Sequence, residues 1–252
     1  MLNTITHGTP TDLPPLLIAH GLYGSARNWN VIAKRISDSR QVVAVDMRNH
    51  GDSGWTDSHS YPDMADDLAE VISRIGGVVD VVGHSMGGKA AMMLALRHPD
   101  ILRRLVVADI APVAYSHSQI SFIKAMRGVD LSRVTRRSDA EIQLADQGVE
   151  RALQGFFTQS LDVAQKRWKL NLDTLANEMP KIMAFPETDA HWDGPTLFLS
   201  GGESDYVQPQ HRNAIRARFP HARFAKLPGA GHWLHAEKPR EFEASLRAFL
   251  TA

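Results

Sequence analysis

The sequence VVDVVGHSMGGK, residues 78–89, decides the fold of this chain. Its first part is rich in valine, as short buried strands are, and it leads into a run of strong helix formers over residues 89–98. The pattern G-x-S-x-G occupies residues 83–87, at the junction of the expected strand and the expected helix. A sharp turn at such a junction exposes a serine hydroxyl at the edge of a sheet. The stretch therefore predicts Ser85 as a candidate nucleophile.

The glycines on either side of this serine explain why the turn can be tight. A Cβ atom at Gly83 or Gly87 would collide with neighbouring backbone, and Ser85 itself is expected to be strained. Because Ser85 precedes a helix, the unpaired amide of Met86 would point toward negative charge that develops beside the serine, as half of an oxyanion hole. The alternative interpretation is a glycine-rich helix start with a capping serine.

Strands and helices alternate in the first half of the chain. The apolar runs that end in a turn or a charged residue are LLIAH (16–20), QVVAVD (41–46), VVDVVGH (78–84) and LVVAD (105–109). Between them, residues 63–75 carry apolar side chains at helical spacing, and residues 89–98 are also expected to be helical. Alternation of this kind requires crossover connections and hence a mostly parallel sheet with helices on both faces. The expected fold class is α/β, with a doubly wound sheet.

The strand signal stops at about residue 112 and returns only after residue 192, and the segment between is polar and helical in character. The expected elements beyond it are two strands and an amphipathic helix, at residues 195–201, 222–229 and 239–250. The expected domains are a core of residues 1–111 and 193–252 and an inserted helical cap of residues 112–192. The cap residues that could line an apolar pocket are Phe122, Met126, Phe156, Phe157, Trp168 and Met183.

Two further loops supply candidate site residues. The segment HGLYG, residues 20–24, follows the first clear strand, and the amide of Leu22 is the candidate second oxyanion donor. His20 is interpreted as a structural residue that orients this loop. In GAGHW near the C-terminus, His232 is the candidate general base, because a histidine can take up and return a proton near neutral pH. His235 is interpreted as a helix-entry contact.

Two aspartates compete for the role of the acid that orients the imidazole. Asp205 follows the strand at 195–201 and fits the chain order serine, aspartate, histidine. Asp109 ends the preceding strand and also lies between Ser85 and His232 in sequence. Either residue could instead be a strand-end cap, so both assignments stay open at this point.

Composition excludes several classes of function. Lys+Arg and Asp+Glu both number 28, so no net positive charge favours nucleic acid. The chain has no cysteine, and no H-E-x-x-H pattern indicates a metal, so neither metal nor organic cofactor is expected. No basic segment followed by an apolar one is visible at the start, and no apolar run is long enough for a membrane span. We expect a cytoplasmic monomer or small homo-oligomer.

The segments HGLYGS, DMRNHGDS, GHSMGGKAAM, DIAPV and GAGHWLHAEKP together resemble the YbfF-type esterases of the α/β-hydrolase fold superfamily. The resemblance extends over nearly the whole chain. It implies an α/β-hydrolase fold with a helical cap, Ser85 and His232 in a catalytic triad, and Asp109 as the acid. The presence of Asp205 as well departs from the family pattern and leaves the acid in question. Residues 48–53 belong to the resemblance, but their pattern indicates only a turn.

The resemblance also implies hydrolysis of short-chain esters and of acyl-CoA thioesters. The expected reaction is acyl transfer through Ser85 to water, with a small acyl ester or thioester of short to medium chain length as the substrate. One fold hosts many reactions, so four alternatives are kept. They are a carbon–carbon bond hydrolase, a lyase-like synthase, a perhydrolase, and a receptor that binds a small ligand without turnover.

Overall fold

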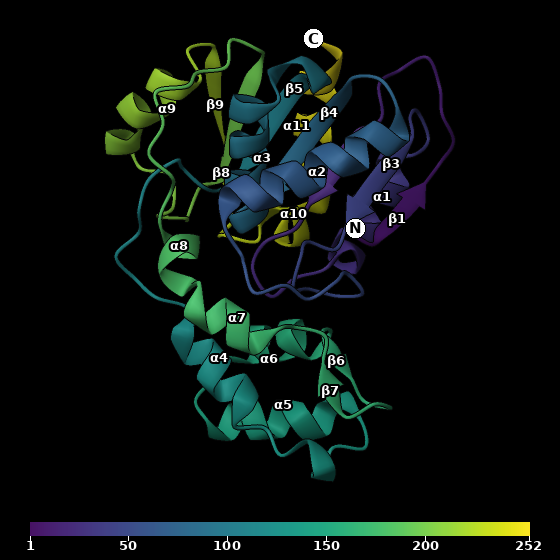
Figure 1. The fold of residues 1–252 in the computed structure, drawn as a ribbon, viewed down its shortest axis with the longest axis vertical. Coiled ribbons are helices and arrows are strands. Elements are labelled where there is room, and N and C mark those ends of the chain that lie inside the picture. Colours follow the sequence, from purple (N-terminus) through teal and green to yellow (C-terminus); the bar gives the residue numbers. More distant parts are fainter.

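The computed structural model describes all residues from Met1 to Ala252 and contains a seven-stranded sheet with the order β1-β3-β2-β4-β5-β8-β9 (Figure 1). Every neighbouring pair is parallel except β1 and β3, which are antiparallel. The strands of this sheet are β1 (Thr4–His7), β2 (Leu16–Ala19), β3 (Val42–Val45), β4 (Val79–His84), β5 (Leu102–Ala108), β8 (Thr196–Gly201) and β9 (Ala222–Leu227). The expected mostly parallel α/β sheet is confirmed.

Helices cover both faces of the sheet. Alternate residues of β2 point to opposite faces: Leu16 and Ile18 pack with α1 and α11, whereas Leu17 and Ala19 pack with α2 and α3. Residues of α9 join the second group. These helices are α1 (Asn30–Ile36), α2 (Tyr61–Ile75), α3 (Met86–Arg97), α9 (Arg212–Arg218) and α11 (Pro239–Thr251), with the short α10 (Leu234–Glu237) before the last. None of the helices combines the length and the apolar character that crossing a membrane requires.

The chain between β5 and β8 forms the expected helical insert. Its elements are α4 (Ile120–Arg127), α5 (Arg137–Asp146), α6 (Arg151–Thr158), β6 (Leu161–Asp162), β7 (Arg167–Trp168), α7 (Leu172–Asn177) and α8 (Met179–Met183). Figure 1 shows α4 to α7 gathered on one side of the molecule, away from the sheet, with α8 on the path back to β8. The division into a core of 1–111 and 193–252 and a cap of 112–192 stays a prediction.

Three elements differ from the sequence-based expectation. The strand β1 was not expected, because its polar sequence TITH has no apolar run, and the strand pairs only at the edge of the sheet. The hairpin of β6 and β7 was also not expected, since each strand has two residues. Helix α3 begins at Met86 rather than at residue 89, because the glycines of the turn continue as its first residues.

The parallel strands bring the predicted site residues to one edge of the sheet. Their carboxyl ends share this edge, and the segments that follow β2, β4, β5 and β9 carry His20, Ser85, Asp109 and His232 in that order. The helical insert leaves the sheet at the same edge, after β5. The site is therefore expected between the strand ends and the insert.

Candidate active site

Ser85 occupies the turn between β4 and α3 in a strained backbone conformation. Its φ of 51° and ψ of −119° lie in a region that residues with a side chain rarely adopt. A Cβ atom at Gly83 would lie 2.3 Å from the carbonyl oxygen of Gly87, and one at Gly87 would lie 2.4 Å from that of Ala19. Both positions therefore require glycine, as the sequence predicted, and the turn fixes the position of the Ser85 hydroxyl.

His232 lies between Ser85 and Asp109. Its Nε2 is 3.1 Å from Ser85 Oγ, and its Nδ1 is 2.7 Å from Asp109 Oδ2. Because the carboxylate faces Nδ1, that nitrogen carries the proton and Nε2 is free to accept the serine proton. The imidazole stacks on the ring of Tyr206, with centroids 4.0 Å apart, and the His232 carbonyl accepts a hydrogen bond from His84 Nε2 at 2.8 Å.

Asp109 is fully buried and surrounded by donors. It follows β5 with a φ of 53°. Its Oδ1 accepts from the amide of Gly201 at 3.1 Å, and its Oδ2 accepts from Ser204 Oγ at 2.5 Å as well as from His232. A carboxylate placed among three donors acts as an acceptor only, which suits it to hold the imidazole in one orientation.

Asp205 is not part of this arrangement. It is exposed, and its Oδ1 accepts a hydrogen bond from Gln208 Nε2 at 3.0 Å. The loop after β8 turns so that the preceding residue, Ser204, faces the site and contacts Asp109. Of the two aspartates that the sequence left open, the structure brings Asp109 to His232 and leaves Asp205 at the surface.

The two candidate oxyanion donors also lie beside Ser85. The amides of Leu22 and Met86 have no acceptor within the protein, and both residues line a small cavity together with Ser85. By contrast, the next amide of the Leu22 loop has an acceptor, because Tyr23 N donates to His50 Nε2 at 3.1 Å. Free amides aimed at a cavity next to a nucleophile are suited to bind a developing oxyanion.

Two buried histidines hold the Leu22 loop in place. His20 Nε2 accepts from the amide of Met47 at 2.9 Å, so its Nδ1 carries the proton that is donated to the Gly21 carbonyl. His50 accepts from Tyr23 in the same way, and burial lowers the pKa of both imidazoles. His20 thus orients the loop, as the sequence predicted. The role of His50 is not predicted by the sequence, because the pattern of residues 48–53 indicates only a turn.

His235 is in α10, and the imidazole that is hydrogen-bonded to Ser85 Oγ is that of His232. The ring of His235 stacks on Trp29 with centroids 4.2 Å apart, and it is buried. Burial lowers the pKa of His235 to about 3, so the side chain is neutral at physiological pH. It forms part of the wall of the site and does not compete with His232 as the base.

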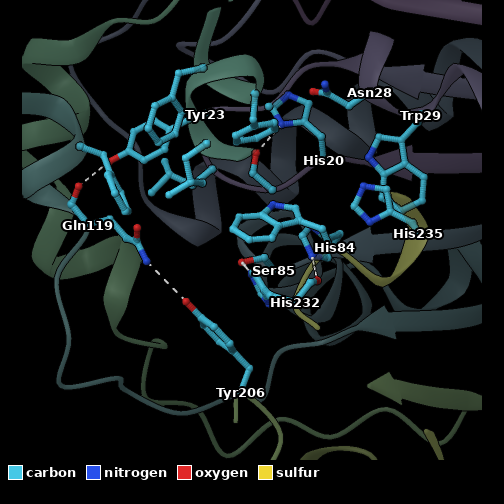
Figure 2. A pocket seen from close by; sticks show the side chains of 18 residues that line it. His20, Tyr23, Asn28, Trp29, His84, Ser85, Gln119, Tyr206, His232 and His235 are labelled. Atoms are coloured by element: carbon cyan, nitrogen blue, oxygen red, sulfur yellow. Dashed lines mark hydrogen bonds between the residues drawn. The ribbon is translucent and has the colours of Figure 1, made fainter. Parts of the chain in front are cut away.

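A pocket of about 310 Å³ opens beside Ser85 and His232 (Figure 2). Its walls are largely apolar, and a pocket of this size suits a small-molecule ligand. Figure 2 shows Gln119, at the start of the insert, between Tyr23 and Tyr206. The backbone carbonyl of Gln119 accepts a hydrogen bond from Tyr23 Oη at 2.9 Å, and its side-chain Nε2 donates to Tyr206 Oη at 3.4 Å. Gln119 was not expected from the sequence, because no motif marks it.

The six apolar residues expected to line a pocket have three different positions. Three of them line the large pocket, namely Phe122, Phe156 and Phe157. Met183 lines a small cavity that also borders Ser85. Met126 and Trp168 are buried inside the insert, where Trp168 Nε1 donates to the carbonyl of Met126 at 2.9 Å.

The small cavity has a volume of about 30 Å³ and is lined by a buried lysine. Its lining includes Leu22, Ser85 and Met86, and also Lys89, whose side chain is 1% exposed. Burial lowers the pKa of Lys89 to about 7. The sequence showed this lysine only as one residue in a helical run, so its place in the site was missed.

The fold and this arrangement of residues define the class of α/β hydrolases, and comparison with known proteins gives the family. The chain belongs to the Alpha/beta hydrolase family, whose family model matches residues 16–245. It is similar to Esterase YbfF of Escherichia coli, with 37% identity over 241 residues that cover 94% of this chain and 92% of the relative. The resemblance to YbfF-type esterases is thus confirmed.

Other relatives are also named as hydrolases of esters. The mouse sn-1-specific diacylglycerol lipase ABHD11 is 44% identical over 250 residues, which cover 94% of this chain and 81% of the relative. A solved structure of a marine microorganism esterase superposes with a TM-score of 0.93 at 38% identity and covers 98% of both chains. The chain is accordingly a hydrolase of the esterase and lipase type.

Proposed function

We propose that this enzyme hydrolyses carboxylic esters of short- to medium-chain acids through a Ser85, His232 and Asp109 triad. The observation that carries the proposal is the continuous line of hydrogen bonds from Asp109 Oδ2 through the imidazole to Ser85 Oγ, at 2.7 and 3.1 Å. Relatives that are named an esterase and diacylglycerol lipases support an ester as the bond that is broken.

The reaction proceeds in two steps. His232 Nε2 takes the proton of Ser85 as Oγ attacks the ester carbonyl, and the amides of Leu22 and Met86 bind the oxyanion. Collapse of the tetrahedral intermediate breaks the bond to the alcohol oxygen, which receives the proton from His232. In the second step His232 deprotonates a water molecule that attacks the acyl-enzyme, and it returns this proton to Ser85 Oγ as the acyl–oxygen bond breaks and the carboxylic acid leaves. Asp109 stabilises the imidazolium in both steps.

The alcohol part of the ester belongs in the large pocket. The proton for the leaving oxygen must come from His232 Nε2, and His232 lines the pocket of about 310 Å³ but not the small cavity. The apolar and aromatic walls of this pocket, which include Phe122, Phe156 and Trp233, favour an uncharged, largely apolar group.

The test combines labelling and turnover. A fluorophosphonate should label wild-type enzyme once per chain at Ser85, and the Ser85→Ala variant should lose turnover of 4-nitrophenyl butyrate by a factor on the order of 10⁴ or more. Labelling without repeated turnover of any ester would instead identify a receptor. Ester turnover that survives in Ser85→Ala would contradict the proposal. So would a wild-type enzyme that cleaves only carbon–carbon bonds, or that transfers acyl groups only to hydrogen peroxide.

A further inference from the structure

The small cavity beside Ser85 is lined by a titratable group, the amine of Lys89, that the proposed reaction does not use. Lys89 is one turn after Ser85 on α3, and side chains on a helix lean toward its N-terminus, so the ammonium is directed to the serine end of the helix. The residue lines the small cavity together with Ser85 and Met86. It is 1% exposed, which is rare for a lysine.

The hydrogen bonds of Lys89 leave one donor unused. Its Nζ donates to the carbonyls of Met183 at 3.0 Å and Ala184 at 2.6 Å. A protonated lysine has three N–H groups, and no carboxylate acts on this one, because burial is the only cause of its lowered pKa. The rings of Tyr61 and Tyr115 lie 5.7 and 4.8 Å from Nζ and offer only their faces. In the protonated state of Lys89, one donor therefore remains for an acceptor in the cavity.

Anchoring the insert does not account for this arrangement. The segment that Lys89 binds is already attached to the core by Tyr61 Oη, which donates to the Ile182 carbonyl at 2.6 Å. Within the insert, Tyr115 N also donates to the Met183 carbonyl at 3.0 Å. Placing a cation in the first turn of a helix and in an apolar surrounding is unfavourable. An anchor alone would need neither a third donor nor a cavity beside it.

The position of the cavity identifies the part of the substrate that it receives. A tetrahedral intermediate on Ser85 has an oxyanion, a leaving oxygen and an acyl group. The oxyanion belongs to the amides of Leu22 and Met86, and the leaving oxygen must face His232. The oxyanion stays beside these amides at the Ser85 end of the small cavity, and His232 does not line this cavity, so the acyl group is the part left to extend further into it.

The size of the cavity limits this acyl group. A water-sized group needs about 10–15 Å³, so a cavity of about 30 Å³ has room for roughly two or three such groups beyond the carbonyl carbon. Most of the lining is hydrophobic, including Ile110 and Ile182, and a bulky charged group would be poorly solvated there. A short neutral chain with one hydrogen-bond-accepting oxygen fits both the space and the free donor.

We propose that Lys89 determines acyl specificity by donating a hydrogen bond to an oxygen within a short acyl group, so that oxygen-bearing acids such as alkoxyacetic acids are preferred over their hydrocarbon counterparts. This inference rests on the proposed ester hydrolysis and deepens it. Lys89 takes no part in the proton transfers, and the acyl chain is the only part of the substrate that it contacts.

The test compares two esters of the same length, 4-nitrophenyl methoxyacetate and 4-nitrophenyl butyrate, which differ by an oxygen in place of a methylene. The selectivity ratio is kcat/KM for the methoxyacetate divided by kcat/KM for the butyrate. It is measured for the wild-type enzyme and for Lys89→Met. A lost hydrogen bond from a charged donor should lower the ratio by roughly tenfold or more. The difference in intrinsic reactivity of the two esters cancels between the two proteins.

The matched control is Lys181→Met, which removes an exposed lysine on α8 that pairs only with Glu178 and should leave the ratio unchanged. A ratio that is the same in wild type and Lys89→Met would overturn the inference, even if both rates fall together through loss of the anchor. Wild-type enzyme that cleaves neither ester would instead contradict the proposed function.

A second measurement covers the case in which Lys89→Met does not fold. A crystal structure of wild-type enzyme with a methoxymethylphosphonate on Ser85 should place the ether oxygen about 3 Å from Lys89 Nζ. An ether oxygen directed into the pocket that contains His232 would refute the assignment.

Discussion

Replacing Asp109 with asparagine changes the proton on His232 without changing the size of the side chain. Asp109 Oδ1 accepts from the amide of Gly201 at 3.1 Å, and Oδ2 faces His232 Nδ1 at 2.7 Å. An asparagine has one oxygen and one NH2 group for these two places. With its oxygen toward Gly201, the NH2 group donates to His232 Nδ1. The opposite orientation would bury two donors against each other at Gly201, which is unfavourable.

The favoured orientation stabilises the wrong tautomer. If Nδ1 accepts a hydrogen bond, the proton of neutral His232 is on Nε2, and that nitrogen can no longer take the proton of Ser85 Oγ, 3.1 Å away. A triad with the wrong tautomer loses about 10⁴ in kcat, which corresponds to about 5 kcal/mol of transition-state stabilisation. KM should change little, because Asp109 is fully buried and does not line the pocket.

The assay is steady-state hydrolysis of 4-nitrophenyl butyrate at neutral pH, with far-UV circular dichroism to confirm folding. The matched control is Asp205→Asn, since Asp205 is exposed and contacts only its own loop, and its kcat should stay within about twofold of wild type. If Asp109→Asn retained more than about a tenth of wild-type kcat, or if Asp205→Asn lost as much, the assignment of the acid would be refuted.

Three further outcomes follow from the structure. Tyr206→Leu removes the ring that stacks on His232 and should lower kcat roughly threefold to tenfold, whereas Tyr206→Phe should lose far less; equal kcat in both variants would exclude a role of the ring. Gly83→Ala places a Cβ 2.3 Å from a backbone oxygen and should lower the free energy of unfolding by at least about 2 kcal/mol, and an unchanged urea midpoint would contradict this. Burial lowers the pKa of His59 and of His235 from 6.5 to about 3, so unfolding takes up protons below pH 6.5 and stability should fall by about 1.4 kcal/mol per pH unit for each histidine. His235→Phe should reduce this slope in urea titrations between about pH 6 and 4, and an identical slope would show that His235 is not responsible.

The sequence by itself determined the elements whose signal is local. Valine-rich runs predicted the buried strands, because a strand that is covered on both faces has no polar side to display. The pair Gly83 and Gly87 predicted the tight turn, since any Cβ there meets backbone. The edge strand β1, with its polar sequence and pairing on one side only, had no such signal.

Only the tertiary structure decided how distant residues meet. Asp109 and Asp205 both follow strands and both fit the chain order, and the path of one loop, which turns Ser204 inward and Asp205 outward, separates them. Lys89 is a second example. In the sequence it is one lysine in a helical run, and only the folded insert buries it and supplies its hydrogen-bond partners. Local patterns record which backbone conformation a segment prefers, but burial and hydrogen-bond partners depend on segments that lie far away in the chain and are brought close by the sheet order.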